Sequence, residues 1–376
     1  MIVAGEASGD MHGAGLVRAM TALVPTLKFL GVGDQALAAQ GVEILFPARQ
    51  LAVVGLVEIF SHWREIRAAL NGLTRRLKER PPSLLILIDF PDFNFILARR
   101  AKRLSIPIFY YISPQVWAWR SGRVKTIARL VDRLAVILPF EEQFYRERGV
   151  GQVTFVGHPL VDTVRTELTP QEFKAKHGID PSATVIGILP GSRRREITSI
   201  LPDFIRTVRL LREARPHLSF LLPLAPTLCR EELGVSDELL AELNIKVISD
   251  HRYDLMAACD LVMAASGTVT LELAILGIPM VVTYRTAPLT YLLGNALVNV
   301  KYASLVNLVV DRQVVTELIQ DAFTPHALCA ALLTIWPGSV RHRTLLLGLR
   351  DVCERLGPPG AADKAARVAL SLLAKG

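Results

Sequence analysis

The sequence has little cysteine and lacks the usual histidine patterns of a metal site. Its four cysteines, at positions 229, 259, 329 and 353, have no metal-ligand spacing, so we expect reduced thiols. None of the eight histidines pairs as HxH or HxxxH. These absences argue against a protein-bound structural metal, and we expect no cofactor.

Long apolar runs are also missing. No stretch reaches the roughly 18–20 residues of a membrane span, because Asp89, Asp92 and Glu272 interrupt the longest candidates. The first residues do not have the pattern of a secretory signal. These absences predict a cytoplasmic chain that does not cross a membrane.

The chain is nevertheless apolar and basic. Of its 376 residues 51% are hydrophobic, and the formal net charge is +8. A basic balance suits nucleic acid, a membrane surface or an anionic substrate. The basic residues are not interleaved with aromatics as in single-strand-binding proteins, so we expect no nucleic-acid partner. Charge combined with hydrophobicity favours an anionic membrane surface or an anionic lipid.

Short apolar runs alternate with helical patterns, which predicts an α/β fold of doubly wound parallel sheets. A break near residues 157–159 divides the alternation into two Rossmann-like domains facing a cleft, at 1–160 and 161–345. The segment 346–376 ends in an amphipathic run that is expected to pack back on the first domain as a helix. The expected strands are 2–4, 28–31, 84–88, 108–112, 133–138, 154–156, 185–189, 219–222, 246–248, 261–264 and 280–283.

Residues 259–283 predict a strand, a tight turn, a helix and a second strand. The turn holds Ser266, Gly267 and Thr268 at a helix N-terminus, where free backbone amides and the helix dipole attract an anion. Glu272 follows one helical turn later on the same face. This order suits a nucleotide, with its diphosphate on the turn and a ribose hydroxyl on Glu272. The alternative is an ordinary strand–helix connection with a solvated glutamate.

A second anion site is predicted where another strand ends. Gly191 permits a close backbone approach, Ser192 offers a hydroxyl, and the Arg193 guanidinium can bind a diphosphate through two hydrogen bonds. Arg194 and Arg195 are expected to point to solvent. The alternative is a capped helix start, but three consecutive arginines there oppose the helix dipole, which favours function.

Asp89 comes directly after a very apolar predicted strand. Ligands of open α/β sheets bind at the carboxyl ends of strands. Partial burial at such an edge raises the pKa of a carboxylate, which suits a general base. Asp89 is therefore our candidate base, with a structural role as the alternative. Asp92 is expected to cap the next helix. Asn94, which ends the same motif, is a candidate contact of the acceptor in the cleft.

A glycine-containing turn follows the first predicted strand and precedes a helix expected at 11–23. It carries Glu6, Ser8, Gly9 and Asp10. The two acids would repel a diphosphate, so the turn better suits a hydroxyl-rich ligand or one wall of the cleft. The alternative is a glycine turn in which Asp10 lies near the N-cap.

Two more segments carry candidate side chains. Residues 111–120 cluster aromatics after a strand, and they predict either a cleft wall near an anionic substrate or simple loop packing. Its candidates are Ser113, Trp117 and Arg120. Residues 53–80 mix apolar and basic side chains, and they predict either core packing or an interfacial helix on acidic lipid. The membrane-facing candidates are Val57, Phe60, Trp63, Arg64 and Arg67.

These motifs, taken in order, resemble those of the lipid-A-disaccharide synthase family along nearly the whole chain. The matching segments are 5–10, 88–94, 113–120, 155–159, 189–193 and 265–272. The resemblance implies an inverting GT-B glycosyltransferase that transfers 2,3-diacylglucosamine from UDP-2,3-diacylglucosamine to 2,3-diacylglucosamine-1-phosphate. The products would be UDP and a β-1,6-linked disaccharide of lipid A synthesis in Gram-negative bacteria. It also implies a peripheral protein on the cytoplasmic face of the inner membrane.

The resemblance also implies residue roles. The family's essential aspartate matches Asp89 and its essential arginine matches Arg193, while its UDP contacts match Ser192, residues 266–268 and Glu272. Asp89 would deprotonate the acceptor 6-hydroxyl, and the arginine and the turn would stabilise the leaving diphosphate without a metal. Family members usually carry several more residues before residue 5, and they often have a double glycine at positions 33–34.

Other functions stay open at this point. One is a different GT-B enzyme, such as an epimerase-like protein acting on UDP-GlcNAc or another sugar transferase. A second is a catalytically inactive protein that binds a nucleotide sugar or a lipid. The two acylated sugars are the expected small-molecule partners, and a homodimer is a candidate assembly.

Overall fold

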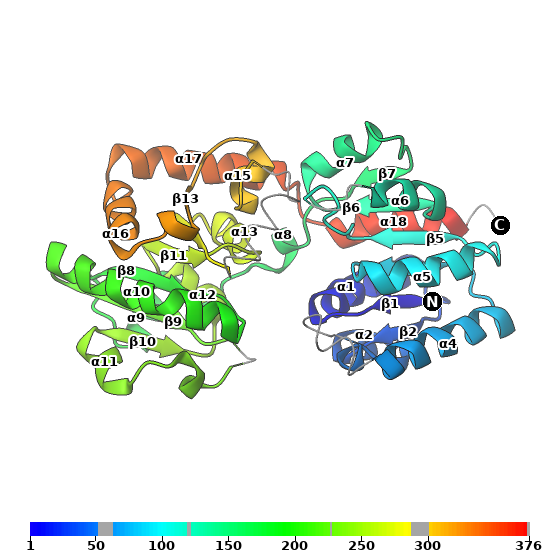
Figure 1. Ribbon diagram of the computed structural model, residues 1–376, viewed down its shortest axis with the longest axis horizontal. Coiled ribbons are helices and arrows are strands. Elements are labelled where there is room, and N and C mark those ends of the chain that lie inside the picture. The colour runs from blue at the N-terminus through cyan, green and yellow to red at the C-terminus, as the bar shows by residue number, and fades with distance from the viewer. Residues whose placement is uncertain (52–62, 119–121, 226–227, 287–300, 374–376) are drawn as a thin grey trace. The chain divides into compact units, whose positions relative to one another are not determined.

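The computed structural model describes residues 1–51, 63–118, 122–225, 228–286 and 301–373. It divides into two compact units, Met1–Pro159 with Leu356–Gly376, and Leu160–Arg355. Each unit is built on a parallel sheet with helices between successive strands, so the predicted fold class is confirmed (Figure 1).

The sheet of the first unit has the strand order β3-β2-β1-β4-β5-β6-β7 in the described residues. The strands are β1 (Ile2–Ala4), β2 (Leu30–Gly33), β3 (Glu43–Pro47), β4 (Leu85–Ile88), β5 (Ile108–Tyr111), β6 (Arg133–Val136) and β7 (Val153–Phe155). The chain builds outward from β1 in one direction and then restarts on its other side with β4. Ligands of open α/β sheets bind at such a switch point, beyond the carboxyl ends of the strands.

Helices cover both faces of this sheet, and successive residues of β4 point to opposite faces. Leu85 and Leu87 join one core, and Ile86 and Ile88 join the other. The helices are α1 (Ala7–Leu23), α2 (Gln35–Ala39), α4 (Trp63–Glu79), α5 (Pro91–Lys102), α6 (Arg123–Leu130), α7 (Pro139–Arg146) and α18 (Ala361–Leu373), with a short 3-10 turn η1 (Ala48–Gln50).

The C-terminal helix α18 belongs to the first unit. It packs on α1 and β6, and its alanines 365, 366 and 369 are fully buried in the same core as Leu16 and Met20 (Figure 1). The chain leaves this unit after Pro159 and returns to it at Leu356. A backbone hydrogen bond joins the two segments at this point, where His158 N donates to Leu356 O at 2.9 Å. The predicted start of this segment at residue 346 instead falls inside a helix of the second unit.

The second unit has the strand order β10-β9-β8-β11-β12-β13 in the described residues, so its switch point lies between β8 and β11. The strands are β8 (Thr184–Leu189), β9 (Leu218–Pro223), β10 (Ile245–Ile248), β11 (Leu261–Ala265), β12 (Met280–Tyr284) and β13 (Thr316–Ile319). The α-helices are α8 (Leu160–Thr163), α9 (Pro170–Lys176), α10 (Arg194–Ala214), α11 (Asp237–Glu242), α12 (Arg252–Ala257), α13 (Val269–Ile275), α15 (Leu305–Val310), α16 (Pro325–Thr334) and α17 (Val340–Arg355). Two 3-10 turns, η2 (Arg230–Leu233) and η3 (Gln320–Ala322), complete the list.

The strand predictions missed β3 and β13, which lie at sheet edges. Neither strand has a fully buried residue. In β13 two of the four residues are polar, so a continuous apolar run is absent, whereas β3 does carry an apolar run at 44–46 that the prediction missed. The helix expected at 11–23 begins at Ala7, so most of the glycine-containing turn lies inside its first turns. No helix in the described part of the chain is long and apolar enough to span a membrane.

Candidate functional site

Asp89 lies at the switch point of the first unit, directly after β4. Its backbone φ angle is +41° and that of Phe90 is +46°, values that residues other than glycine rarely adopt. The neighbouring side chains hold this turn: Tyr110 Oη donates to Asp89 O at 2.5 Å, and Asn94 Nδ2 donates to the same oxygen at 2.7 Å. Such strain persists where the surroundings overdetermine it, and it clusters at functional sites.

The Asp89 carboxyl group has an unusual proton affinity. Burial, and to a smaller extent the negative charge of Glu6, raise its pKa from the ordinary 3.8 to about 6, although a hydrogen bond with the Phe90 backbone lowers it. A carboxylate with this pKa is ionised at neutral pH and still basic enough to take a proton from a positioned hydroxyl. The geometry therefore suits a general base.

The glycine-containing turn lies against Asp89 and Phe90, and its members have different roles. A Cβ on Gly5 would lie 2.3 Å from the Phe90 ring, so only glycine fits there. Glu6 and Ser8 are exposed and Gly9 is buried. These three stay candidate ligand contacts.

Asp10 has a structural role, but at the start of α2 rather than at that of its own helix. Its buried carboxylate accepts hydrogen bonds from the backbone amides of Asp34 at 2.7 Å, Ala36 at 2.9 Å and Leu37 at 3.3 Å. It therefore caps the short helix α2 rather than presenting both oxygens to a ligand. The prediction of Asp10 as a cleft residue is corrected to a support of the neighbouring loop.

The segment after β5 lies at the same edge of the sheet. Ser113 is buried, and its hydroxyl hydrogen-bonds the Tyr145 hydroxyl, so its side chain faces the protein interior. Trp117 is partly exposed, and its indole nitrogen donates to Glu141 Oε1 at 3.0 Å. Arg120 lies outside the described residues. Sequence reasoning missed Glu141, although its place three residues after Leu138 is that of a capping glutamate.

The carboxylate of Glu196 closes the turn after β8. Glu196 Oε2 accepts from Ser192 N at 3.0 Å and Arg193 N at 3.3 Å. Gly191 has a φ of +112°, and a Cβ there would lie 2.2 Å from that oxygen. The Arg193 side chain is 73% exposed, with its guanidinium 3.6 Å from Glu196 Oε1. The turn thus presents an accessible cation, while its amides have an internal partner, so the capped helix start that was the alternative is present. The diphosphate contact of Arg193 stays a prediction.

The turn after β11 occupies the other side of the same switch point. Gly267 and Thr268 are exposed, and a Cβ on Gly267 would meet nothing within 4 Å. Ser266 Oγ donates to Ala303 O at 2.8 Å, which joins the turn to the segment before α15. The open backbone fits the predicted anion contact.

Glu272 is buried and has partners that were not predicted. Its Oε1 accepts a short hydrogen bond from the Arg252 guanidinium and a longer one of 3.4 Å from Tyr253 Oη. Burial raises the pKa of Glu272, although the positive charge of Arg252 opposes the rise. The alternative of a solvated glutamate is wrong, because the side chain is 7% exposed.

The membrane candidates are described only in part. Val57, Phe60 and the side chain of Trp63 lie outside the described part of the structure. Arg64 and Arg67 are exposed on α4, while Leu70, Leu73 and Leu77 of the same helix are buried in the core. The helix thus has an inner face that packs on the sheet and a basic outer face.

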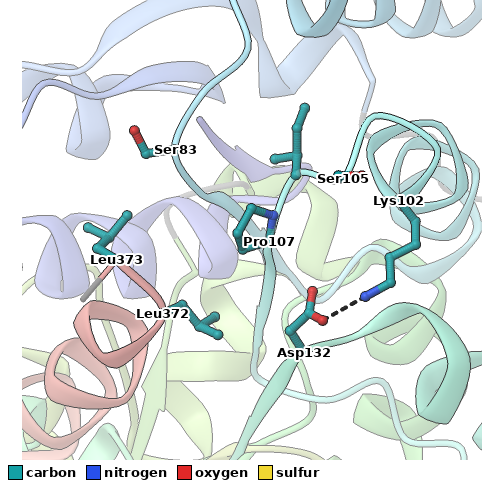
Figure 2. Close-up of a pocket in the computed structure, with 8 residues that line it drawn as sticks. Ser83, Lys102, Ser105, Pro107, Asp132, Leu372 and Leu373 are labelled. Atoms are coloured by element: carbon teal, nitrogen blue, oxygen red, sulfur yellow. Dashed lines mark hydrogen bonds and ion pairs between the residues drawn. The ribbon is translucent and has the colours of Figure 1, made fainter. Parts of the chain in front are cut away.

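A hollow of about 720 Å³ lies in the first unit, away from Asp89. Its lining includes Ser83, Pro107 and Asp132, each just before β4, β5 or β6, so it lies at the amino ends of the strands. Figure 2 shows Lys102 reaching Asp132, with a nitrogen–oxygen distance of 2.6 Å. This hollow is at the opposite sheet edge from the candidate site.

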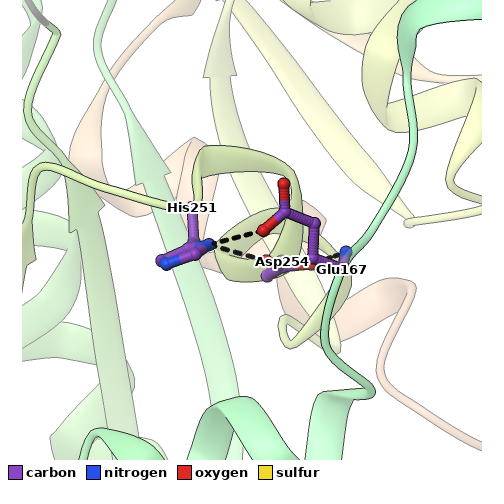
Figure 3. A group of neighbouring side chains, drawn as sticks. All are labelled: Glu167, His251 and Asp254. Atoms are coloured by element: carbon purple, nitrogen blue, oxygen red, sulfur yellow. Dashed lines mark hydrogen bonds and ion pairs between the residues drawn. The ribbon is translucent and has the colours of Figure 1, made fainter.

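One group of side chains in the described residues could hold a metal ion. It comprises Glu167, His251 and Asp254 of the second unit (Figure 3). His251 Nδ1 lies 3.3 Å from Asp254 Oδ2, and Asp254 Oδ1 accepts from the amides of Glu167 at 2.7 Å and Leu168 at 3.1 Å. These contacts give the buried Asp254 a structural role, which is to fasten the segment before α9 to the start of α12.

Comparison with known proteins gives a consistent result along the chain. A family model described as lipid-A-disaccharide synthetase matches residues 1–353. The lipid-A-disaccharide synthase of Geobacter metallireducens is 46% identical over 376 residues, which covers 100% of this chain and 97% of that protein.

Solved structures share the fold at low sequence identity. UDP-GlcNAc 2-epimerase from Neisseria meningitidis, bound to UDP-GlcNAc, has a TM-score of 0.62 at 14% identity, over 100% of this chain and 99% of that chain. The glycotransferase of kitacinnamycin has a TM-score of 0.64 at 16% identity, over 99% and 98%. At such identities the likeness concerns the fold, which is that of GT-B glycosyltransferases.

Proposed function

The chain belongs to the lipid-A-disaccharide synthetase family. We propose that its two switch points bind the two different substrates of one sugar transfer. The enzyme is a glycosyltransferase of lipid A biosynthesis that joins 2,3-diacylglucosamine from UDP to 2,3-diacylglucosamine-1-phosphate. The first unit takes the acceptor and the second takes the UDP-sugar. The observation that carries this division is the constrained, partly buried Asp89 at one switch point and the exposed Arg193 at the other.

The chemical step begins with Asp89. Its carboxylate takes the proton of the acceptor 6-hydroxyl as that oxygen attacks the anomeric carbon of the donor sugar. The attack comes from the face opposite UDP, so the configuration inverts and a β-1,6 linkage forms. The constrained turn at residues 89–90 holds the base in place, which lowers the entropic cost of the step.

The leaving group is UDP, and its diphosphate gains negative charge in the transition state. The Arg193 guanidinium, the Ser192 hydroxyl and the open turn at 266–268 stabilise this charge without a metal. Glu272 accepts a ribose hydroxyl while Arg252 keeps its carboxylate oriented. Gly191 has a supporting role in this turn, because the Glu196 carboxylate packs so closely against it that no Cβ fits.

One assay tests this proposal against its alternatives. Purified protein is incubated with UDP-2,3-diacylglucosamine and 2,3-diacylglucosamine-1-phosphate, and UDP and disaccharide are measured. We expect equal amounts of both products and no turnover of UDP-GlcNAc. Turnover of UDP-GlcNAc without an acylated substrate would instead indicate an epimerase-like activity, and binding without turnover would indicate an inactive protein.

Metal removal is expected to leave the transfer rate unchanged. The Glu167–His251–Asp254 group is already joined by internal contacts, and the charge on the diphosphate has arginine and backbone partners. Initial rates measured with and without an excess of EDTA, after dialysis against the chelator, check this expectation. A rate that falls with EDTA and returns with one added divalent ion would contradict it.

We further propose that the enzyme works as a peripheral protein on the cytoplasmic face of the inner membrane, where its acylated substrates reside. The exposed arginines at the start of α4 support this, because basic side chains are attracted to anionic lipid. The helix is fastened to the core by its inner leucines, so it would present its basic face without unfolding.

Charge reversal on this face is expected to weaken binding to anionic vesicles. Each of Arg64→Glu and Arg67→Glu should reduce the partition coefficient on the order of tenfold, since each basic residue contributes about 1 kcal/mol near such a surface and the reversal adds repulsion. Vesicle sedimentation measures the effect, and Arg209→Glu on the exposed face of α10 is the matched control. Equal binding of all three variants would favour core packing as the only role of α4.

A further inference from the structure

The first unit contains a buried carboxylate that the proposed reaction does not use. Glu141 is 1% exposed, at the third position of α7. Its Oε2 accepts from the backbone amides of Leu138 at 2.9 Å and Ile137 at 3.2 Å, and its Oε1 accepts from the Trp117 indole nitrogen at 3.0 Å. An ionised carboxylate, which only accepts, thus meets three donors.

This arrangement exceeds what a helix cap requires. A capping glutamate normally serves backbone amides at the protein surface and needs no side-chain donor. Here burial, with a smaller contribution from the charge of Asp89, raises the pKa of Glu141 to about 7, although the three hydrogen bonds lower it. Ionising this carboxylate at neutral pH therefore costs desolvation free energy, which the three donors offset. A neutral leucine would avoid that cost but would leave the indole nitrogen without an acceptor.

The Glu141 contact fixes one segment relative to α7. Trp117 belongs to the segment after β5, and its ring packs edge-on against Phe140 with centroids 5.0 Å apart. A second hydrogen bond joins the same two elements, between the hydroxyls of Ser113 and Tyr145. Two polar contacts and one aromatic contact therefore hold the Trp117 segment against α7.

The segment lies on the proposed acceptor side. Strands β4, β5 and β6 are parallel neighbours, and Asp89, Trp117 and Glu141 all follow their carboxyl ends. The Trp117 ring is only partly covered, although its nitrogen is engaged. An aromatic face oriented in this way suits the apolar face of a sugar ring or the start of an acyl chain.

We propose that Glu141 is a positioning residue for the acceptor: it fixes the Trp117 ring at the sheet edge beside Asp89, where the ring contacts the acylated sugar. The proposal rests on the function proposed above, because it takes the Asp89 edge as the acceptor site. It predicts an effect on acceptor binding that is separate from donor binding and from folding.

The test compares Glu141→Gln with Glu142→Gln on the same helix. Glutamine keeps an acceptor for the backbone amides but turns a donor toward the indole nitrogen, whereas Glu142 pairs with Arg146 one turn further along the helix. We expect Glu141→Gln to raise the KM for 2,3-diacylglucosamine-1-phosphate on the order of tenfold, the size expected for losing a hydrogen bond to a charged group. The KM for the UDP-sugar and the Tm should match those of Glu142→Gln.

Trp117→Phe probes the same contact from the other side, and it serves if Glu141→Gln does not fold. It should also raise the acceptor KM, and the double variant should be no worse than either single one, because both remove one interaction. The inference is overturned if Glu141→Gln and Trp117→Phe keep the control's acceptor KM, or if both KM values rise equally. Asp89→Asn is assayed alongside: if it stays active, the proposed function fails, whatever the Glu141 variants do.

Discussion

Replacing Asp89 with asparagine is expected to lower the rate of disaccharide formation by about 10²–10⁴-fold, the usual contribution of a general base. Asparagine has the same shape and leaves the backbone oxygen that Tyr110 and Asn94 hold, so the constrained turn should persist. The amide cannot take the proton of the acceptor hydroxyl. Initial rates at saturating concentrations of both substrates measure the loss.

Asp92→Asn is the matched control for this variant. Asp92 lies three residues further along, its side chain is 77% exposed, and it pairs with Arg123 on the surface. Its loss should change the rate by less than about threefold, because exposed ion pairs contribute little. Similar rates for the Asp89 and Asp92 variants would contradict the assignment of the base.

The same carboxyl group gives the reaction a pH dependence of known sign. The base must be ionised, so the rate should fall as pH drops through about 6, the pKa of Asp89 in the folded protein. Folding shows the opposite trend. The pKa of Asp89 is raised from 3.8 on folding, so its stabilising contribution is complete below 3.8 and is lost as pH rises through about 6. Asp89→Asn should therefore be less active but more stable at neutral pH.

Replacing Arg193 is expected to have the second largest effect. Arg193→Ala should lower kcat by about 10²–10³-fold, the loss measured when one donor to a developing negative charge is removed. Arg193→Lys should recover part of the rate, because an ammonium keeps the charge but not the paired hydrogen bonds. Steady-state kinetics together with UDP binding by calorimetry separate the effect on the transition state from the effect on ground-state affinity.

Arg194→Ala and Arg195→Ala serve as controls, since both side chains are exposed in the first turn of α10. Each should keep most of the activity. If either variant loses as much activity as Arg193→Ala, the diphosphate contact has been assigned to the wrong arginine. All three changes remove one positive charge near the same helix start, so a general electrostatic effect would be common to them.

The central strands and the positions of Asp89 and Arg193 followed from the sequence, because both depend on local patterns. Buried parallel strands are continuous apolar runs, and a polar residue at the end of such a run lies at the carboxyl edge of the sheet. The edge strand β13 lacks this pattern, because two of its four residues are polar, whereas the apolar run at 44–46 of β3 is a signal that the prediction missed.

The partners of the charged side chains could not be predicted, because they come from distant parts of the chain. Asp10 caps a helix 24 residues later, and Glu272 pairs with Arg252 on a different helix. Only the assembled sheet brings such groups together. The sequence shows that a carboxylate is present, but only the fold decides whether its hydrogen-bond donors come from the protein or from a ligand.

The return of the chain to the first unit has a consequence for biosynthesis. All of Leu160–Arg355 is one continuous segment, whereas the first unit needs α18 to cover β6 and α1. During translation the second unit can complete its core while the first still exposes the apolar surface that buries alanines 365, 366 and 369. The first unit begins to be synthesised before the second but therefore finishes folding after it. The proposed acceptor site thus forms on a scaffold that is completed only after the second unit has been synthesised.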